Sequence, residues 1–174
     1  MTLKTTQRRF WNVFPAQIML ALLLVPLTGD AIAQSAKDLV GTWTFVSAVN
    51  TRPDGSKFDP WGGKAEGLQM FDSAGHFSWQ VIRYDIPKLA SNNRLQGTAD
   101  EFKAVAQGVL SAFGTYSLDD SGKTLTQHIK ISSFPNFNDA NRTWTIALTG
   151  DELTIGSQAG AAGGTNELKW KRVK

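Results

Sequence analysis

Few residues in this chain of 174 have side chains suited to catalysis or metal binding. Cysteine is absent, so disulfides, thiolate metal ligands and cysteine nucleophiles are excluded. The two histidines, His76 and His128, fall in different predicted strands without carboxylates at ligand spacing. A zinc site needs three or four ligands, so no metal site is predicted. No cofactor is predicted either.

His128 is the candidate catalytic residue. An imidazole titrates near neutral pH, so inside a cavity His128 could act as a base or orient a carboxylate. The alternative is a structural histidine that bonds a loop carbonyl near Pro135. Ile129 alternates with His128 along the strand, so an inward Ile129 places His128 on the outer surface. No Gly-x-Ser-x-Gly elbow supports hydrolysis by a serine.

Two arginines could anchor the acidic head of a ligand, because a guanidinium binds a carboxylate with two parallel hydrogen bonds. Arg142 opens a strand whose apolar face includes Trp144, and Arg83 ends a strand whose apolar face includes Trp79. The alternative is that each arginine stacks on an aromatic ring or pairs with a carboxylate. The residues predicted to contact a ligand are Trp79, Arg83, Tyr84, His128, Arg142 and Trp144.

Two short signatures bracket the part of the chain that reads as strands. Gly41 and Trp43 open the first strand, and Trp170 and Arg172 close the last one. In a small barrel the indole would fill one end and the guanidinium would lie across it, a contact of about 0.5–2 kcal/mol. These four residues therefore predict a closed barrel floor and leave an open mouth at the other end, which favours binding.

Strands with a two-residue period must position these side chains. An up-and-down barrel of eight antiparallel strands is predicted because closure removes exposed edges, and a sandwich is the alternative. Such a barrel either fills with side chains or holds one small ligand. The predicted strands are 42–51, 66–72, 76–84, 114–118, 124–132, 142–149, 153–158 and 166–173.

One amphipathic helix interrupts the strands near residues 99–111. Thr98 and Glu101 form a capping box, and the apolar face includes Phe102 and Val105. This face is expected to lie on the mouth or flank of the barrel.

Residues 1–33 read as a Sec-type signal peptide cleaved after Ala33, and residues 34–174 as one domain. The leader combines basic residues, an apolar stretch over 18–27 and a small-residue cleavage site. An apolar run of about ten residues is too short for a bilayer that needs ~20, so no stable membrane anchor is expected. A retained anchor is the less favoured alternative. The predicted location is periplasmic or secreted.

The charge of the predicted mature domain is small. The leader has three basic residues against Asp30, a net charge of +2, so +1 of the formal +3 belongs to residues 34–174. A partner such as nucleic acid is not indicated, since no strongly basic footprint remains.

An ordered set of short motifs spans residues 38–173. The motifs are Gly41-Thr42-Trp43, Asp54-Gly55-Ser56, Gly67-Leu68, Gly114-Thr115-Tyr116, His128, Ser132 to Asn136, Arg142, Gly150 to Leu153 and Leu168 to Arg172. Taken together, the motifs resemble the bacterial and fungal lipocalin-like domain family, within the calycin group of barrels. The resemblance implies an eight-stranded barrel and gives an activity only loosely. Two loops, residues 57–64 and 137–141, depart from the family pattern.

Three functions remain open at this point. The favoured one is an exported barrel that binds or carries a small apolar or amphipathic molecule in its cavity. The second is an isomerase, cyclase or hydrolase that uses an inward His128. The third is a filled barrel that binds another protein through its rim. The direction of His128 and the interior volume separate the three, and the oligomeric state is not predicted.

Overall fold

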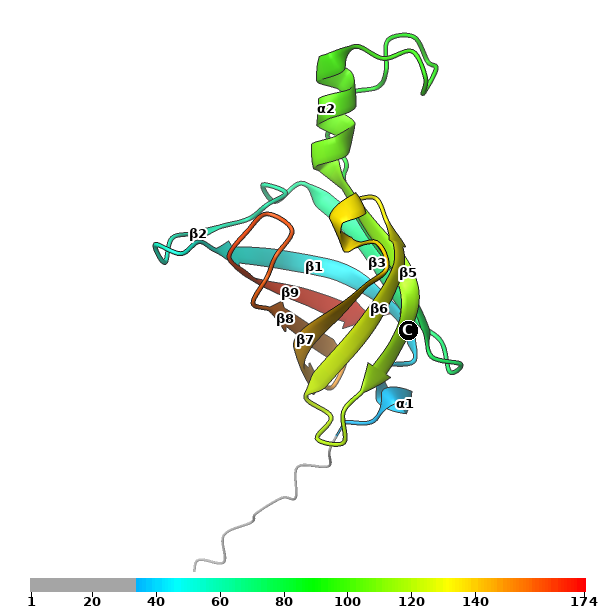
Figure 1. Ribbon diagram of the computed structural model, residues 1–174, viewed down its shortest axis with the longest axis vertical. Helices are drawn as coiled ribbons and strands as arrows, with labels where there is room; N and C mark the ends of the chain where they lie inside the picture. The colour runs from blue at the N-terminus through cyan, green and yellow to red at the C-terminus, as the bar shows by residue number, and fades with distance from the viewer. Residues whose placement is uncertain (1–33) are drawn as a thin grey trace, which may run out of the picture. The chain divides into compact units, whose positions relative to one another are not determined.

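The computed structural model describes residues 34–174, which form a closed antiparallel β-barrel (Figure 1). Eight strands make the wall, and the two-residue strand β2 (Lys57–Phe58) extends one end of β1. The prediction of an eight-stranded antiparallel barrel is therefore confirmed. The predicted signal peptide, residues 1–33, lies outside the described residues. The strands of the wall are β1 (Gly41–Thr51), β3 (Ala65–Phe71), β4 (His76–Arg83), β5 (Val109–Leu118), β6 (Thr124–Ser132), β7 (Ala140–Thr149), β8 (Glu152–Ser157) and β9 (Thr165–Arg172).

The strands follow one another around the barrel in sequence order, and β1 pairs with β9 to close it. The closing register runs from Trp43 opposite Arg172 to Thr51 opposite Thr165, with a shift between Phe45 and Ser47. Closure satisfies the strand edges that an open sheet would expose. It also brings the first and last strands side by side, so residues far apart in the sequence share one end of the barrel.

Alternation along each strand determines which side chains fill the interior. In β4, Phe77, Trp79 and Val81 are buried, while Gln80 between them and Ile82 after them are exposed. The same rule places Leu125 and Ile129 of β6 inside. The inward apolar residues form one continuous core that holds the wall together.

Within residues 34–174, three short helices accompany the wall: α1 (Ala36–Leu39), α2 (Ala99–Gly108) and the 3-10 turn η1 (Pro135–Phe137). The predicted capping box of α2 is present: the Thr98 hydroxyl accepts from the Glu101 amide, and the Glu101 carboxylate accepts from the Thr98 amide. Among residues 34–174, no helix has both the length and the apolar character needed to cross a bilayer.

The helix α2 ends at Gly108, three residues before the end of the predicted range near 99–111, and β5 begins at Val109 rather than at Gly114. Val109 and Leu110 continue the apolar period of the helix, but in the structure they belong to β5 and pair with Ile82 and Val81 of β4. Strand pairing satisfies their backbone groups and half-buries both side chains. This stabilisation exceeds what the two residues would contribute to the apolar face of the helix.

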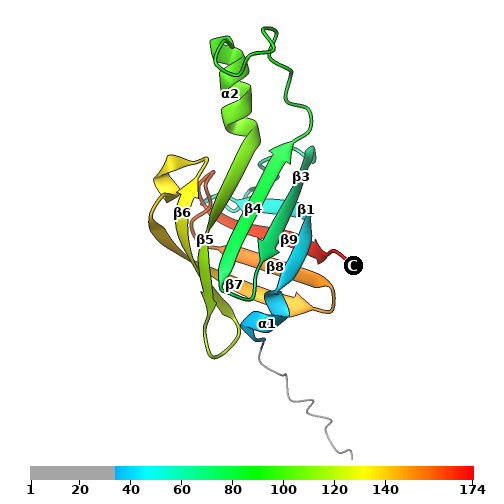
Figure 2. The ribbon, with the colours of Figure 1, turned by 90° about the vertical axis from the view of Figure 1, so that its right-hand side faces the viewer.

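The expected docking of α2 on the barrel was also wrong. Figures 1 and 2 show the helix standing off the open end of the barrel, with the 84–98 connection beside it. Phe102 and Val105 remain 40% and 37% exposed. The connection covers part of the helix itself: a Cβ on Gly97 would lie 2.8 Å from the Phe102 ring. We call residues 84–108 the arm.

Candidate ligand-binding site

One end of the barrel is closed by the four residues that the sequence singles out there. Trp43 is fully buried, and its indole Nε1 donates to the Leu39 carbonyl at 2.9 Å. The Arg172 guanidinium lies 4.0 Å above the Trp43 ring and donates to the Val40 carbonyl at 2.9 Å. Trp170 is buried beside this pair. The interaction joins the last strand to the α1 turn across the barrel floor.

Gly41 permits this close contact. Its φ is +133°, a conformation that side chains with a Cβ rarely adopt, and an added Cβ would lie 3.1 Å from Arg172 Nη1. Any larger residue would therefore strain the backbone and displace the guanidinium from the Trp43 ring.

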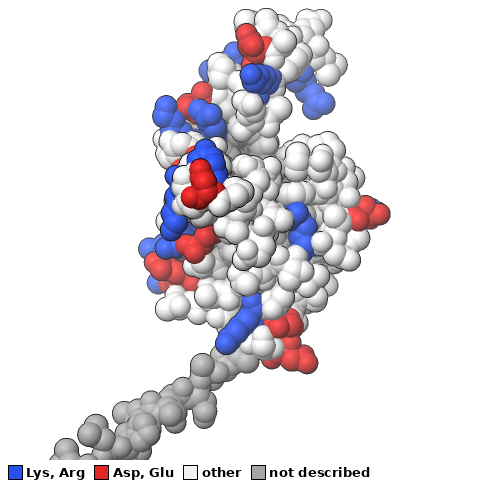
Figure 3. Space-filling model, turned by 60° about the vertical axis from the view of Figure 1, so that its left-hand side comes forward, with Lys and Arg blue, Asp and Glu red and all other residues white. Residues whose placement is uncertain are grey.

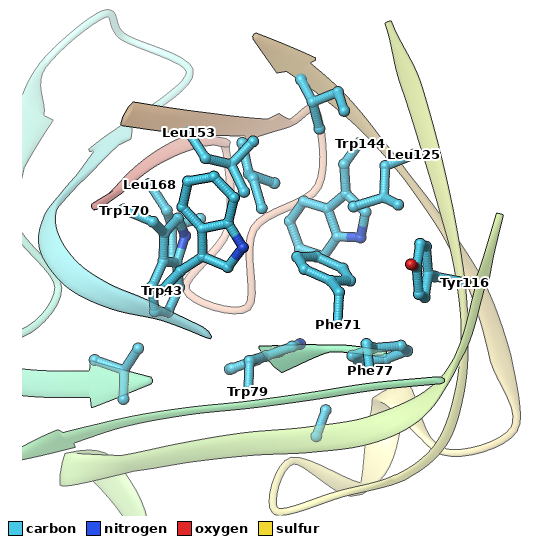
Figure 4. Close-up of a cluster of buried hydrophobic side chains, with 14 of the residues drawn as sticks. Trp43, Phe71, Phe77, Trp79, Tyr116, Leu125, Trp144, Leu153, Leu168 and Trp170 are labelled. Atoms are coloured by element: carbon cyan, nitrogen blue, oxygen red, sulfur yellow. The ribbon is translucent and has the colours of Figure 1, made fainter. Parts of the chain in front are cut away.

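Above the floor the barrel is largely filled by apolar side chains, as Figure 4 shows. Phe71 and Tyr116 pack edge to face at 4.8 Å, and Leu125 and Leu153 belong to the same core. The remaining internal void has a volume of only about 40 Å³. This space accepts a few water molecules or a small chemical group, but not a whole ligand.

A larger cavity of about 520 Å³ lies at the open end. Trp61, Leu110, Ala161 and Asn166 line both this mouth cavity and the internal void, so the two spaces adjoin. The arm contributes Ala106 and Gln107 to the wall of the mouth cavity, together with Phe134 from the β6–β7 connection. In Figure 3 the hollow on the right between the arm and the barrel is uncharged, whereas charged side chains of both signs gather on the left.

Two glutamines line the internal void among the aromatic rings. Gln69 on β3 and Gln127 on β6 are each only 2% exposed. Within residues 34–174, neither side-chain amide takes part in a side-chain hydrogen bond, and most of the other residues that line the void are apolar. Neither glutamine was predicted from the sequence to be a site residue. Strand alternation could have identified Gln127, because it lies between Leu125 and Ile129 on the inward face of β6.

Other polar atoms near this void are also unpartnered within the described part of the chain. They are the indole Nε1 of Trp144, the indole Nε1 of Trp170 and Oδ1 of Asn166. All three residues line the void. Buried polar groups are ordinarily paired, so this concentration marks a place where another molecule supplies the partners.

Trp79 and Trp144, two of the predicted ligand-contacting residues, are buried and line the internal void. Arg142 lies at the rim on the same face of β7 as Trp144. Its guanidinium stacks 4.0 Å over Phe137 and donates to the Ala159 carbonyl. Burial lowers the pKa of Arg142 from its usual value. The arginine therefore holds the β8–β9 connection and η1 together, and it lines neither the internal void nor the mouth cavity.

Arg83 lines the mouth cavity, but its guanidinium is already paired. Its Nε and Nη2 donate to the two carboxylate oxygens of Asp85, both at 2.8 Å. This bond lowers the pKa of Asp85 to about 2, so the pair stays charged at neutral pH. Tyr84 lines neither the internal void nor the mouth cavity and is 65% exposed, because it has the opposite parity to Arg83. Its contact with a ligand stays a prediction.

His128 also lies outside the cavity. Its side chain is 44% exposed on the outer face, where Nδ1 lies 3.1 Å from Asn141 Oδ1 and Nε2 lies 3.5 Å from Asp139 Oδ1. The inward positions of β6 are taken by Leu125, Gln127 and Ile129, so parity directs His128 outward. The hypothesis of a cavity base at His128 has no support from this geometry. Within residues 34–174, no group of three or more potential ligands could hold a metal ion.

The chain belongs to the lipocalin-like domain family, whose profile matches residues 40–173. A comparison with curated proteins returned no match. Among solved structures, a lipocalin-like protein from Bacteroides uniformis is 15% identical, with a TM-score of 0.43, and the match covers 78% of this chain and 99% of that one. A mutant of the fluorescent protein UnaG is 12% identical, with a TM-score of 0.38, covering 79% of this chain and 97% of that one.

Proposed function

We propose that this protein is exported and binds a small, mainly apolar molecule at the open end of its barrel. The observation that carries the proposal is the mouth cavity of about 520 Å³ that adjoins an internal void with unpartnered polar groups. Cavities for small molecules commonly have about 300–1,000 Å³ and combine apolar walls with a few polar groups.

The volumes of the internal void and the mouth cavity determine where each part of such a ligand would bind. The internal void of about 40 Å³ accepts only one small group, so the body of the ligand occupies the mouth cavity. There it contacts Trp61, Leu110 and Phe134 of the barrel and Ala106 of the arm. Burial of the apolar body contributes roughly 25 cal/mol per Å² of apolar area removed from water.

Dye binding with a blocked mouth tests this proposal. Wild type should bind the uncharged dye Nile red with 1:1 stoichiometry and a blue-shifted emission. Ala106→Trp fills the mouth cavity and should weaken binding at least ten-fold, whereas Lys103→Trp, on an exposed helix position outside the cavity, should leave it unchanged. Equal binding by the two variants, or none by wild type, would contradict the proposal. Native mass spectrometry of gently purified protein would then identify the natural ligand.

A further inference from the structure

We propose that the ligand enters the barrel with an uncharged amide- or lactam-type group first, and that this group pairs with the side chains of Gln69 and Gln127. The inference rests on the proposed function and specifies the chemistry of the molecule that is bound. It reverses the arrangement expected from the arginines, in which an acidic head would remain at the rim.

The two glutamines form a built polar site inside an apolar barrel. Gln69 comes from β3, where it is paired with Trp43 and Trp79 on the neighbouring strands. Gln127 comes from β6, three strands further around the wall, where it is paired with Tyr116 and Arg142. Both are 2% exposed and both line the internal void. Their amides therefore face one small space from two sides of the barrel.

Leaving these amides unpaired is unfavourable. A buried amide without a partner loses its hydrogen bonds to water and gains nothing in return. A leucine of similar size would fill the same positions without this penalty. Two buried amides that face the same void are therefore explained by a partner that is not part of the chain.

The absence of charge around the void specifies that this partner is uncharged. None of the described residues that line the void is acidic or basic. Arg83 is paired with Asp85, and Arg142 is bound to the β8–β9 connection. A carboxylate inserted among Trp79, Trp144 and Trp170 would lose its hydration. The Arg142 guanidinium lies 5.2 Å from the Trp144 ring and does not line the void.

The available partners favour a group that both donates and accepts. Each glutamine amide offers a carbonyl acceptor and an NH₂ donor. Asn166 Oδ1 adds an unpartnered acceptor, and the indoles of Trp144 and Trp170 add unpartnered donors. An amide or lactam presents an N–H beside a carbonyl and can serve both kinds of partner, whereas a ketone or ester can only accept.

Three probes with the same aromatic body test the inference by isothermal titration calorimetry: 2-naphthamide, 2-naphthoate and 2-methylnaphthalene. Wild type should bind the amide at least ten-fold more tightly than the carboxylate or the hydrocarbon. In Gln69→Leu and Gln127→Leu the preference over the hydrocarbon should fall below about three-fold, through loss of amide affinity alone. Continued binding of 2-methylnaphthalene shows that each variant is folded. Gln80→Leu, on the exposed face of β4, is the matched control and should keep the preference.

The outcomes distinguish the inference from the proposed function. Equal affinity of wild type for amide and hydrocarbon, or a preference that survives in both leucine variants, shows that the glutamines hold only water. That result overturns the inference and leaves ligand binding intact. Loss of all three probes in both variants shows a structural role and also overturns it. Failure of wild type to bind any probe overturns the proposed function and the inference together.

Discussion

Trp43 is the residue on which the closed end of the barrel depends most. It is fully buried, donates to Leu39 and supports the Arg172 guanidinium. Trp43→Ala removes a large buried aromatic and should lower the free energy of unfolding by about 3–5 kcal/mol. Urea denaturation measures the loss, and Tyr84→Ala on the exposed surface is the control. A midpoint for Trp43→Ala close to that of wild type would show that the floor does not depend on the indole.

Gln127 is expected to reduce stability in the ligand-free protein. Its amide is buried among mainly apolar side chains, so Gln127→Leu should raise the free energy of unfolding by about 1–3 kcal/mol. The exposed substitution Gln80→Leu should change it by less than about 0.5 kcal/mol. Thermal and urea unfolding of both variants measure the difference. If Gln127→Leu were less stable than wild type, its amide would already be paired in the free protein.

The same residues show how far side-chain roles could be predicted from the sequence. Parity correctly separates inward Trp79 and Trp144 from outward Gln80, because the strand period is two. Parity does not show which group each arginine binds. Arg83 donates to Asp85, only two residues away, and Arg142 donates to the Ala159 carbonyl, which is distant in the sequence. The partners of an arginine are therefore not determined by strand parity.

At the level of elements, the arm differs most from its prediction. The capping box identifies the start of α2, but the apolar period cannot identify its end, since Val109 and Leu110 suit a helix face and a strand equally. Val109 and Leu110 form part of a strand because β4 is available to pair with them. The same pairing carries the helix away from the barrel surface.

The helix in the arm should depend on the charge of Glu101. Its carboxylate accepts from the Thr98 and Ala90 amides, both at 2.7 Å, and these bonds hold the pKa of Glu101 below its usual value. Because the folded pKa is depressed, the stabilisation is complete above the ordinary glutamate pKa and is lost as the pH falls through the lowered one.

Amide hydrogen exchange tests the role of Glu101 at neutral pH. Glu101→Gln should speed exchange several-fold in α2 while the barrel strands keep wild-type protection, because the arm has few contacts with the wall. Asp100→Asn, in the same first turn, is the matched control. Equal exchange in α2 for Glu101→Gln and wild type would contradict the role assigned to this carboxylate.

At the scale of the whole chain, the barrel is closed and filled at one end and open at the other. Alternation and edge closure could predict the eight strands and their order. The location of the cavity could not be predicted, because it depends on how far the tryptophans and phenylalanines fill the interior. Its lining includes connections such as 158–164 and the start of the β6–β7 connection, which strand periodicity does not describe.

Export makes a separate prediction for the whole chain. If residues 1–33 are a signal peptide, the mature protein begins at Gln34, because Ala31 and Ala33 are the small residues that a signal peptidase selects. Amino-terminal sequencing of the protein from the exported fraction of cells measures this directly. An Ala33→Pro variant, which blocks cleavage, should accumulate as the precursor. Recovery of exported wild-type protein that still begins at Met1 would contradict cleavage.

The central claim is that a ligand occupies the open end with its polar head in the internal void. Nuclear magnetic resonance of ¹⁵N-labelled protein titrated with 2-naphthamide tests it most directly, because glutamine side-chain amides and tryptophan indoles give separate signals. The largest shifts should fall on the side chains of Gln69 and Gln127 and on the indoles that line the void. Gln69→Leu and Gln127→Leu assign the two amides. Shifts confined to the outer face around His128, or to the arm alone, would contradict the claim.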